Sequence, residues 1–124
     1  MIFVFGSNEA GIHGAGAAKI ALNKHGAIYG KSYGHYGDSF AIPTKDEYIQ
    51  TLALDRIEMY VIGFLAYAMG RRKLKFKVTA IGTGLAGYTH EEIAPMFRMA
   101  PANCSFDTAW KPYLSTDHKF WGTY

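Results

Sequence analysis

Two glycine-rich loops, each placed directly after a predicted strand, constrain the fold of this chain most. The first loop at 6–16 follows residues 2–5 (Ile-Phe-Val-Phe), and the second loop at 82–88 follows residues 75–81 (Lys-Phe-Lys-Val-Thr-Ala-Ile), which alternate at first and become apolar at the end. A short continuous apolar run is typical of a strand that is buried on both faces of a parallel sheet. An alanine-rich segment follows the first loop and predicts a helix that ends near His25. The expected order is therefore strand, glycine loop, helix.

The middle of the chain continues this alternation. Residues 40–42 (Phe-Ala-Ile) predict a second strand, which Pro43 would end. The helical spacing of apolar residues over 51–69 predicts the strongest helix of the sequence. Thr51 is the expected cap of this helix, and Gly70 is expected to end it.

Three further segments complete the expected elements. Residues 29–37 repeat Tyr-Gly three times without apolar periodicity, so they are predicted to form a loop. Thr89-His90-Glu91-Glu92 fits a capping box, and the helix that it starts would reach about residue 99, with a kink or a late start at Pro95. Residues 103–106 are expected to form the last short strand.

Strands that alternate with helices of this length predict an α/β fold. The expected architecture is a mostly parallel central sheet with helices on both faces, in three layers. A chain of 124 residues has room for one domain, so residues 1–124 are expected to form a single unit. Residues 107–124 are rich in aromatic side chains, including Trp110 and Trp121, and this tail is expected to pack on the body.

Cysteine and apolar patterning indicate where the protein works. The single cysteine, Cys104, excludes an internal disulfide and favours a reducing, cytoplasmic location. The longest nearly uncharged apolar run, residues 59–70, is shorter than the ~20 residues that cross a bilayer, so no membrane partner is expected. The five histidines show no metal-ligand spacing with one another or with Cys104, so we expect no metal, and no cofactor either. The sequence does not specify the oligomeric state.

The net charge of +3 comes with one dense basic cluster, residues 71–73 (Arg-Arg-Lys), with Lys75 and Lys77 close behind. Cations are favourable after a helix carboxyl terminus, and we favour this explanation. Because no familiar nucleic-acid module is present, the sequence disfavours a nucleic-acid partner. A basic nucleic-acid or protein interaction module is kept as a further alternative.

The glycine loops are the candidate binding elements. In parallel sheets ligands bind beyond the carboxyl ends of the strands, which is where both loops are expected. Glycine lets backbone N–H groups approach an anion closely, and the start of a following helix favours negative charge. For one loop alone, a tight strand-to-helix turn is the better explanation. Two such loops favour a ligand that carries phosphate.

The residues that carry these loops resemble those of the macro domain, the fold that binds ADP-ribose and related nucleotides. The resemblance rests on residues 4–8 (Val-Phe-Gly-Ser-Asn), 14–18 (Gly-Ala-Gly-Ala-Ala) and 80–85 (Ala-Ile-Gly-Thr-Gly-Leu), and it extends over about residues 2–106. It is nearest to the branch of terminal ADP-ribose protein glycohydrolase. Macro domains usually begin with additional strands, so the chain resembles a minimal form without them.

The resemblance implies a set of ligand-binding residues. The first loop would wrap the distal ribose and its phosphate, the second would close over the pyrophosphate, and an asparagine would lie near the distal ribose. The implied residues are Asn8, Gly14, Ala15, Gly16, Ala17, Gly82, Thr83, Gly84, Leu85, Ala86, Gly87 and Tyr88. ADP-ribose or a related nucleotide is thus the expected partner. The Tyr-Gly segment or the aromatic tail is the expected source of contacts to adenine.

The resemblance also implies a candidate catalytic residue, Lys45. It follows Pro43-Thr44, where the glycohydrolase branch has a lysine that attacks the anomeric carbon of the distal ribose. An ADP-ribosyl hydrolase or deacylase that uses Lys45 is therefore the alternative to a binding protein. Position 86 departs from the pattern, because Ala86 replaces the residue that assists hydrolysis there. Asp46 and His90 are the nearby candidates to take over that role.

Overall fold

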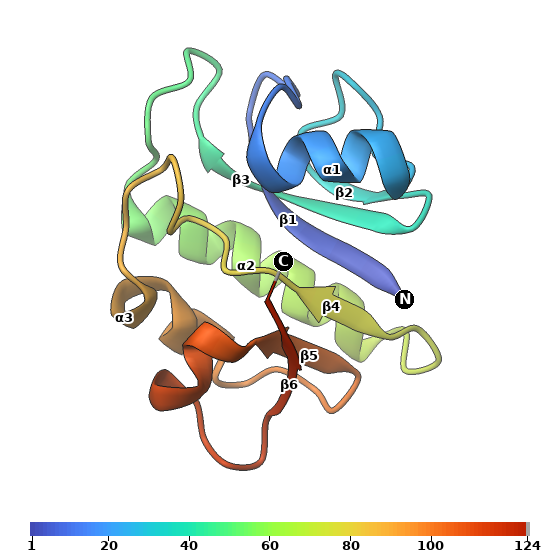
Figure 1. Cartoon of the computed structure of the whole chain (residues 1–124), viewed down its shortest axis with the longest axis vertical. Coiled ribbons are helices and arrows are strands. Elements are labelled where there is room, and N and C mark those ends of the chain that lie inside the picture. Colours follow the sequence, from blue (N-terminus) through green and yellow to red (C-terminus); the bar gives the residue numbers. More distant parts are fainter. Residues whose placement is uncertain (124) are drawn as a thin grey trace.

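A six-stranded sheet in the order β2-β3-β1-β4-β5-β6 organises the computed structural model, which describes residues 1–123 (Figure 1). The strands are β1 (Ile2–Asn8), β2 (Gly34–Tyr36), β3 (Ser39–Lys45), β4 (Phe76–Val78), β5 (Cys104–Asp107) and β6 (Lys119–Gly122). The α-helices are α1 (Gly16–Lys24), α2 (Leu54–Met69) and α3 (His90–Ile93), and the 3-10 helices are η1 (Ala94–Phe97) and η2 (Thr108–Tyr113). All neighbouring strands are parallel except β2, which pairs antiparallel with β3. The prediction of a single α/β domain with a mostly parallel sheet is confirmed.

The centre of the sheet is β1, which pairs with β3 on one side and β4 on the other. Ile2, Phe3, Val4 and Phe5 are all buried. Phe3 and Phe5 pack against α1 on one face, whereas Val4 belongs to the larger cluster that α2 covers on the opposite face. Both faces of β1 are therefore covered, as the continuous apolar run of residues 2–5 predicts.

Helical coverage of the two faces is unequal. On the α2 face, α2, α3, η1 and η2 contribute to one large core together with residues of β1, β3, β4 and β5. On the other face, α1 packs only over β1 and β3, and Figure 1 shows that no helix lies in front of β4, β5 and β6. The alternating sequence Lys75-Phe76-Lys77-Val78 fits this arrangement, because Phe76 and Val78 are buried while both lysines reach solvent.

Two predicted boundaries around β3 and α2 are wrong. Pro43 does not end its strand, because β3 continues to Lys45. The missing N–H of Pro43 is tolerated, since β2 pairs only with residues 39–41 and leaves that side of Pro43 without a strand. Thr51 does not cap α2. It forms an isolated antiparallel bridge with Lys45, and the cap position is Ala53.

The helix ends predicted from glycines and the capping box predicted at Thr89 agree with the structure. The α1 helix ends at Lys24 and α2 ends at Met69, as predicted, and Gly70 occupies the cap of α2. Both hydrogen bonds of the capping box are present: the Glu92 N–H donates to Thr89 Oγ1, and the Thr89 N–H donates to Glu92 Oε1. Pro95 lies where α3 gives way to the 3-10 helix η1, which is the predicted disturbance.

Two short strands were not expected. Within the supposed Tyr-Gly loop, β2 forms the antiparallel edge, and β6 follows β5, which is therefore not the last strand. In the tail, the Trp110 side chain is fully buried, and Trp121 Nε1 donates to the carbonyl oxygen of Val78 at 2.8 Å. Over residues 1–123, none of the helices is long and apolar enough to cross a membrane.

Candidate functional site

A cavity of about 480 Å³ opens at the carboxyl ends of β1 and β3 and just beyond β4. Its volume falls within the range of ~300–1,000 Å³ that is usual for small-molecule sites. The lining residues are Gly6, Ser7, Asn8, Ile12, Gly14, Ala15, Gly16, Ala17, Ala18, Thr44, Lys45, Ile49, Thr79, Ala80, Ile81, Gly82, Gly84, Leu85 and Ala86. Both glycine loops thus contribute to one cavity.

The topology explains why a cavity lies there. From β1 the chain passes through α1 to β3 on one side, and from β3 it passes through α2 to β4 on the other side of β1. The connections leaving the two sides of β1 therefore diverge, and a crevice opens between the loops at its carboxyl end. This is the switch point at which open α/β sheets bind ligands.

The first loop is fixed by Asn8 and by a close approach of two glycines. Asn8 Nδ2 donates to the carbonyl oxygen of Ile12 at 2.8 Å, and Asn8 Oδ1 accepts from the Ile12 N–H at 3.0 Å. Gly11 has a φ of 73° and lies against Gly30, whose N–H donates to the Gly11 carbonyl oxygen at 2.8 Å. Asn8 lines the cavity as expected, but both polar atoms of its side-chain amide are hydrogen-bonded to the backbone of the loop at Ile12.

The start of α1 faces the same cavity. Gly16, Ala17 and Ala18 occupy the first helical positions, where backbone N–H groups have no intrahelical acceptor. The cap residue, Ala15, has no side-chain oxygen to accept from these groups, and the first turn contains no acidic residue. The amino-terminal end of α1 therefore offers unshielded donors and a positive dipole end to the cavity.

The second loop borders the cavity from the β4 side. Gly82, Gly84, Leu85 and Ala86 line it, and a Cβ at Gly84 would meet no atom within 4 Å. The Leu85 side chain is 77% exposed at the rim.

Three other residues of the second loop that the resemblance singled out do not line the cavity. Thr83 Oγ1 donates to the Ala80 carbonyl oxygen at 2.7 Å, and Tyr88 donates its hydroxyl proton to the Leu52 carbonyl oxygen at 2.7 Å. Gly87 has a φ of 87° and closes the turn, with its N–H donating to the Gly84 carbonyl oxygen at 3.0 Å. These residues hold the loop in shape.

Lys45 and Ala86 come together at one end of the cavity. Lys45 is the last residue of β3 and bridges to Thr51, whose hydroxyl donates to the Ala86 carbonyl oxygen at 3.0 Å. The segment between β3 and α2 is thereby tied to the second loop. Ile49 lies in this segment with a φ of 64°, which is rare for a β-branched residue, and it also lines the cavity.

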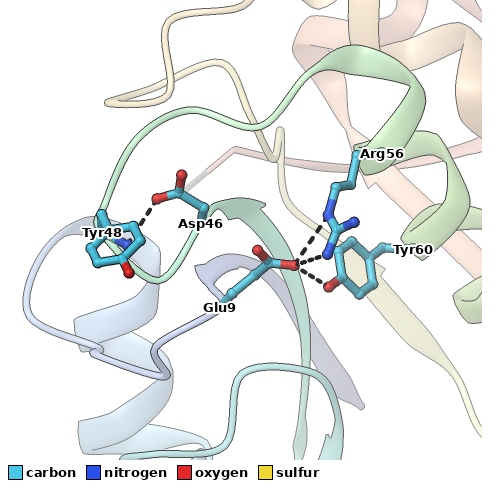
Figure 2. Close-up of polar contacts among 5 residues, drawn as sticks. All are labelled: Glu9, Asp46, Tyr48, Arg56 and Tyr60. Carbon is cyan, nitrogen blue, oxygen red and sulfur yellow. Dashed lines mark hydrogen bonds and ion pairs between the residues drawn. The ribbon is translucent and has the colours of Figure 1, made fainter.

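A polar cluster beside Lys45 was not predicted from the sequence. Glu9 Oε2 accepts hydrogen bonds from Tyr60 and from Arg56, whose Nη2 lies 2.8 Å away (Figure 2). The hydrogen bond from Tyr60, followed by that from Arg56, lowers the pKa of the Glu9 carboxyl below its ordinary value. The Glu9 N–H also donates to the Lys45 carbonyl oxygen at 2.8 Å, so the cluster anchors the end of β3. The i, i+4 spacing places Arg56 and Tyr60 on one side of α2, but it does not indicate that Glu9 lies opposite them.

The expected substitutes for a catalytic residue at position 86 do not line the cavity. Asp46 Oδ1 accepts from the N–H group of Tyr48 (Figure 2) and from that of Gln50, and these two hydrogen bonds shape the turn after β3. His90 Nδ1 accepts from Trp110 Nε1 at 3.1 Å.

The two segments from which contacts to adenine were expected do not line the cavity either. The lining includes no residue of the Tyr-Gly segment or of the tail among residues 1–123.

His13 of the first loop is also outside the lining. It is buried, with Nε2 3.1 Å from the Ile28 carbonyl oxygen, and so it packs inside the loop.

The chain is therefore a single α/β domain with a switch-point cavity that is framed by two glycine loops. Compared with models of protein families, with curated proteins and with solved structures, it matches none of them.

Proposed function

We propose that the cavity binds ADP-ribose or a related nucleotide, in the manner that the resemblance to the macro domain implies. The observation that carries this proposal is the unshielded start of α1, which faces the second glycine loop across one cavity. Backbone N–H groups at a helix start bind phosphate without a basic side chain. A second loop with open space at Gly84 leaves room for the other phosphate of a pyrophosphate.

Calorimetry with ADP-ribose tests this proposal, with Gly84→Val as the decisive variant. A side chain at position 84 meets no protein atom within 4 Å at its Cβ, so the fold should be retained while the cavity is obstructed. We expect loss of at least tenfold in affinity, or about 1.4 kcal/mol. Gly70→Val is the matched control, because Gly70 lies at the end of α2 outside the cavity and its Cβ would make only ordinary contacts, at 3.7 Å.

Two outcomes contradict the binding proposal. One is the absence of binding tighter than a dissociation constant of about 1 mM, which corresponds to about 4 kcal/mol, for ADP-ribose and related nucleotides. The other is equal affinity in the Gly84→Val and Gly70→Val proteins, since the ligand would then lie elsewhere.

An ADP-ribosyl hydrolase is the second candidate, and the observation that favours it is that Lys45 lines the cavity. In this reaction Lys45 Nζ would attack the anomeric carbon of the distal ribose as the bond from that carbon to the modified side chain breaks, and the side chain would leave with the proton that the amine loses. Water would then hydrolyse the lysine adduct, which releases ADP-ribose and restores Lys45. Ala86 lines the same end and supplies no group for proton transfer. Release of ADP-ribose from an ADP-ribosylated protein should stop in Lys45→Ala and persist in Lys31→Ala, an exposed lysine outside the lining. Turnover that survives Lys45→Ala rejects this role.

A further inference from the structure

The half of the sheet that α1 leaves uncovered carries a row of polar residues. Phe3 of β1 pairs in register with Lys77 of β4, Lys77 with Ser105 of β5, and Ser105 with Lys119 of β6. Paired residues of neighbouring strands point to the same face, so the row begins under α1 at Phe3 and continues into solvent. Lys77, Ser105 and Lys119 all retain exposed surface.

An aromatic side chain lies across this row. Trp121 follows Phe120 at the irregularity in the pairing of β5 with β6, and its Nε1 reaches the Val78 carbonyl oxygen of β4. Lys77 Nζ lies 4.3 Å from the centroid of the indole ring. Trp121 is only partly buried, so the uncovered strands present an indole beside a lysine.

Further cations surround the amino-terminal end of these strands. The end of α1, the connection after α2 and the start of β4 lie at one end of the molecule, away from the cavity (Figure 1). They carry the exposed residues Lys24, Arg71, Arg72, Lys73 and Lys75. Burial, followed by the charge of Lys77, lowers the pKa of His25, while the Asp38 carboxylate at this end of the molecule opposes the shift and Lys24 adds to it.

The helix dipole does not explain this arrangement fully. Cations at positions 71–73 complement the end of α2, but Lys77 and Lys119 lie on strands. None of these cations forms an ion pair within residues 1–123, where the one ion pair joins Arg56 and Glu9. Two of them have other contacts: the Arg71 guanidinium lies 3.8 Å from the centroid of the Tyr67 ring, and Arg72 Nε donates to the Met69 carbonyl oxygen at 3.2 Å. No carboxylate within residues 1–123 therefore neutralises these cations through an ion pair.

We propose that Lys77, Ser105, Lys119 and Trp121, together with Lys24 and Lys75, form a binding surface for single-stranded nucleic acid. We call this surface the basic sheet face. Cations along a strand surface contact successive phosphates, and an indole beside them stacks on a base. Ser105 separates the two lysines, and its hydroxyl donates to the Phe76 carbonyl oxygen at 3.3 Å. An anionic membrane is a poorer partner, because Phe3 at the start of the row is buried under α1 and the rest of the row, Lys77, Ser105 and Lys119, is polar. The basic sheet face is independent of the cavity.

Fluorescence anisotropy with a labelled single-stranded 20-nucleotide probe, DNA and RNA in parallel, tests the proposal between 20 and 200 mM salt. We expect binding that weakens linearly on a logarithmic plot against salt, with a slope of about −0.7 for each neutralised phosphate. The Lys77→Gln/Lys119→Gln protein should bind about tenfold more weakly, and its slope should fall by about 0.7 for each lysine removed. Lys31→Gln/Lys111→Gln removes the same charge from exposed residues elsewhere and should change affinity less than twofold.

The aromatic contribution is read separately, from quenching of Trp121 fluorescence by oligothymidine, with Trp121→Phe as the protein that lacks the signal. The Gly84→Val protein should bind the probe as the wild type does, so failure at the cavity and failure at the basic sheet face are distinguishable. Any of three results overturns the proposal. These are no binding at 20 mM salt, equal weakening in the two double variants, and association with anionic phospholipid vesicles or polyglutamate that is as tight as with the probe.

Discussion

The side-chain amide of Asn8 is paired with the backbone of Ile12 through two hydrogen bonds, one in each direction. The pair closes the turn that begins the first glycine loop, immediately after β1. An asparagine fits this position because its amide offers a donor and an acceptor on one short side chain. The start of α1, and with it the donors that face the cavity, is therefore positioned from β1.

Replacing Asn8 should lower stability through this pair. Asn8→Ala removes both hydrogen bonds and is expected to cost about 1–3 kcal/mol of unfolding free energy. Asn8→Asp keeps an acceptor for the Ile12 N–H but loses the donor, so its loss should be smaller than that of Asn8→Ala. Urea denaturation gives the values, and Asn23→Ala, at an exposed position of α1, is the control. Equal stability of Asn8→Ala and Asn23→Ala would show that the pair contributes nothing.

Gly11 should tolerate no side chain, unlike Gly14 three residues later. A Cβ on Gly11 would lie 2.4 Å from the carbonyl carbon of Gly30, and its φ of 73° disfavours side chains. We expect Gly11→Ala to lose at least about 2 kcal/mol. Gly14→Ala should change stability by less than about 1 kcal/mol, since its Cβ would meet only Ile12 Cγ2, at 4.0 Å. Thermal unfolding of the two proteins side by side checks this contrast.

The Glu9 cluster should make stability depend on pH in the acid range. Because hydrogen bonds from Tyr60 and Arg56 lower the pKa of Glu9 in the folded state, the folded protein binds fewer protons than the unfolded chain. The stabilisation is complete above the ordinary value of 4.5 and is lost as the pH falls through the lower folded value. Urea midpoints measured from pH 6 to pH 3 should fall less steeply in Glu9→Gln than in the wild type. Glu47→Gln, at an exposed position after β3, should keep the wild-type slope.

Cys104 should be unreactive while the protein is folded. The side chain is buried, and burial raises the pKa of the thiol to about 12. Since the thiolate is the reactive form, iodoacetamide at pH 8 should label Cys104 only when denaturant unfolds the chain. Mass spectrometry of the native and denatured protein measures the labelled fraction. Rapid labelling of the native protein would show that β5 opens locally.

Sequence patterns located the elements better than their ends. The apolar run marks β1 because the strand is buried on both faces. Gly26 marks the end of α1 because its φ of 77° is left-handed, whereas Gly70 ends α2 with an ordinary φ of −79°. The prediction that Pro43 ends its strand was wrong, because the missing N–H of proline matters only where a neighbouring strand would accept from it. Strand β2 has only three residues, all partly buried at the edge of the sheet, so the sequence shows no alternation of apolar and polar residues that would predict it.

The candidate site was predictable in its loops and not in its supporting contacts. Glycines in both predicted loops line the cavity, but Thr83 and Tyr88 bond to neighbouring backbone instead, and spacing alone does not distinguish the two roles. Gly11 and Gly14 look alike in the sequence, although only Gly11 lies against another backbone segment. The meeting of Glu9 with Tyr60 depends on how α2 crosses the sheet, which a local pattern does not specify.

The central place of β1 also governs how the chain can fold. Strand β1 precedes both of its partners, which lie far downstream at residues 39–45 and 76–78. Phe3 and Phe5 pack against α1, which follows soon after β1, but the pairing of β1 with β4 has to wait until residue 78 has been made. Non-local parallel pairing of this kind slows folding. The distance along the chain between β1 and its partners thus limits how early the centre of the sheet can assemble.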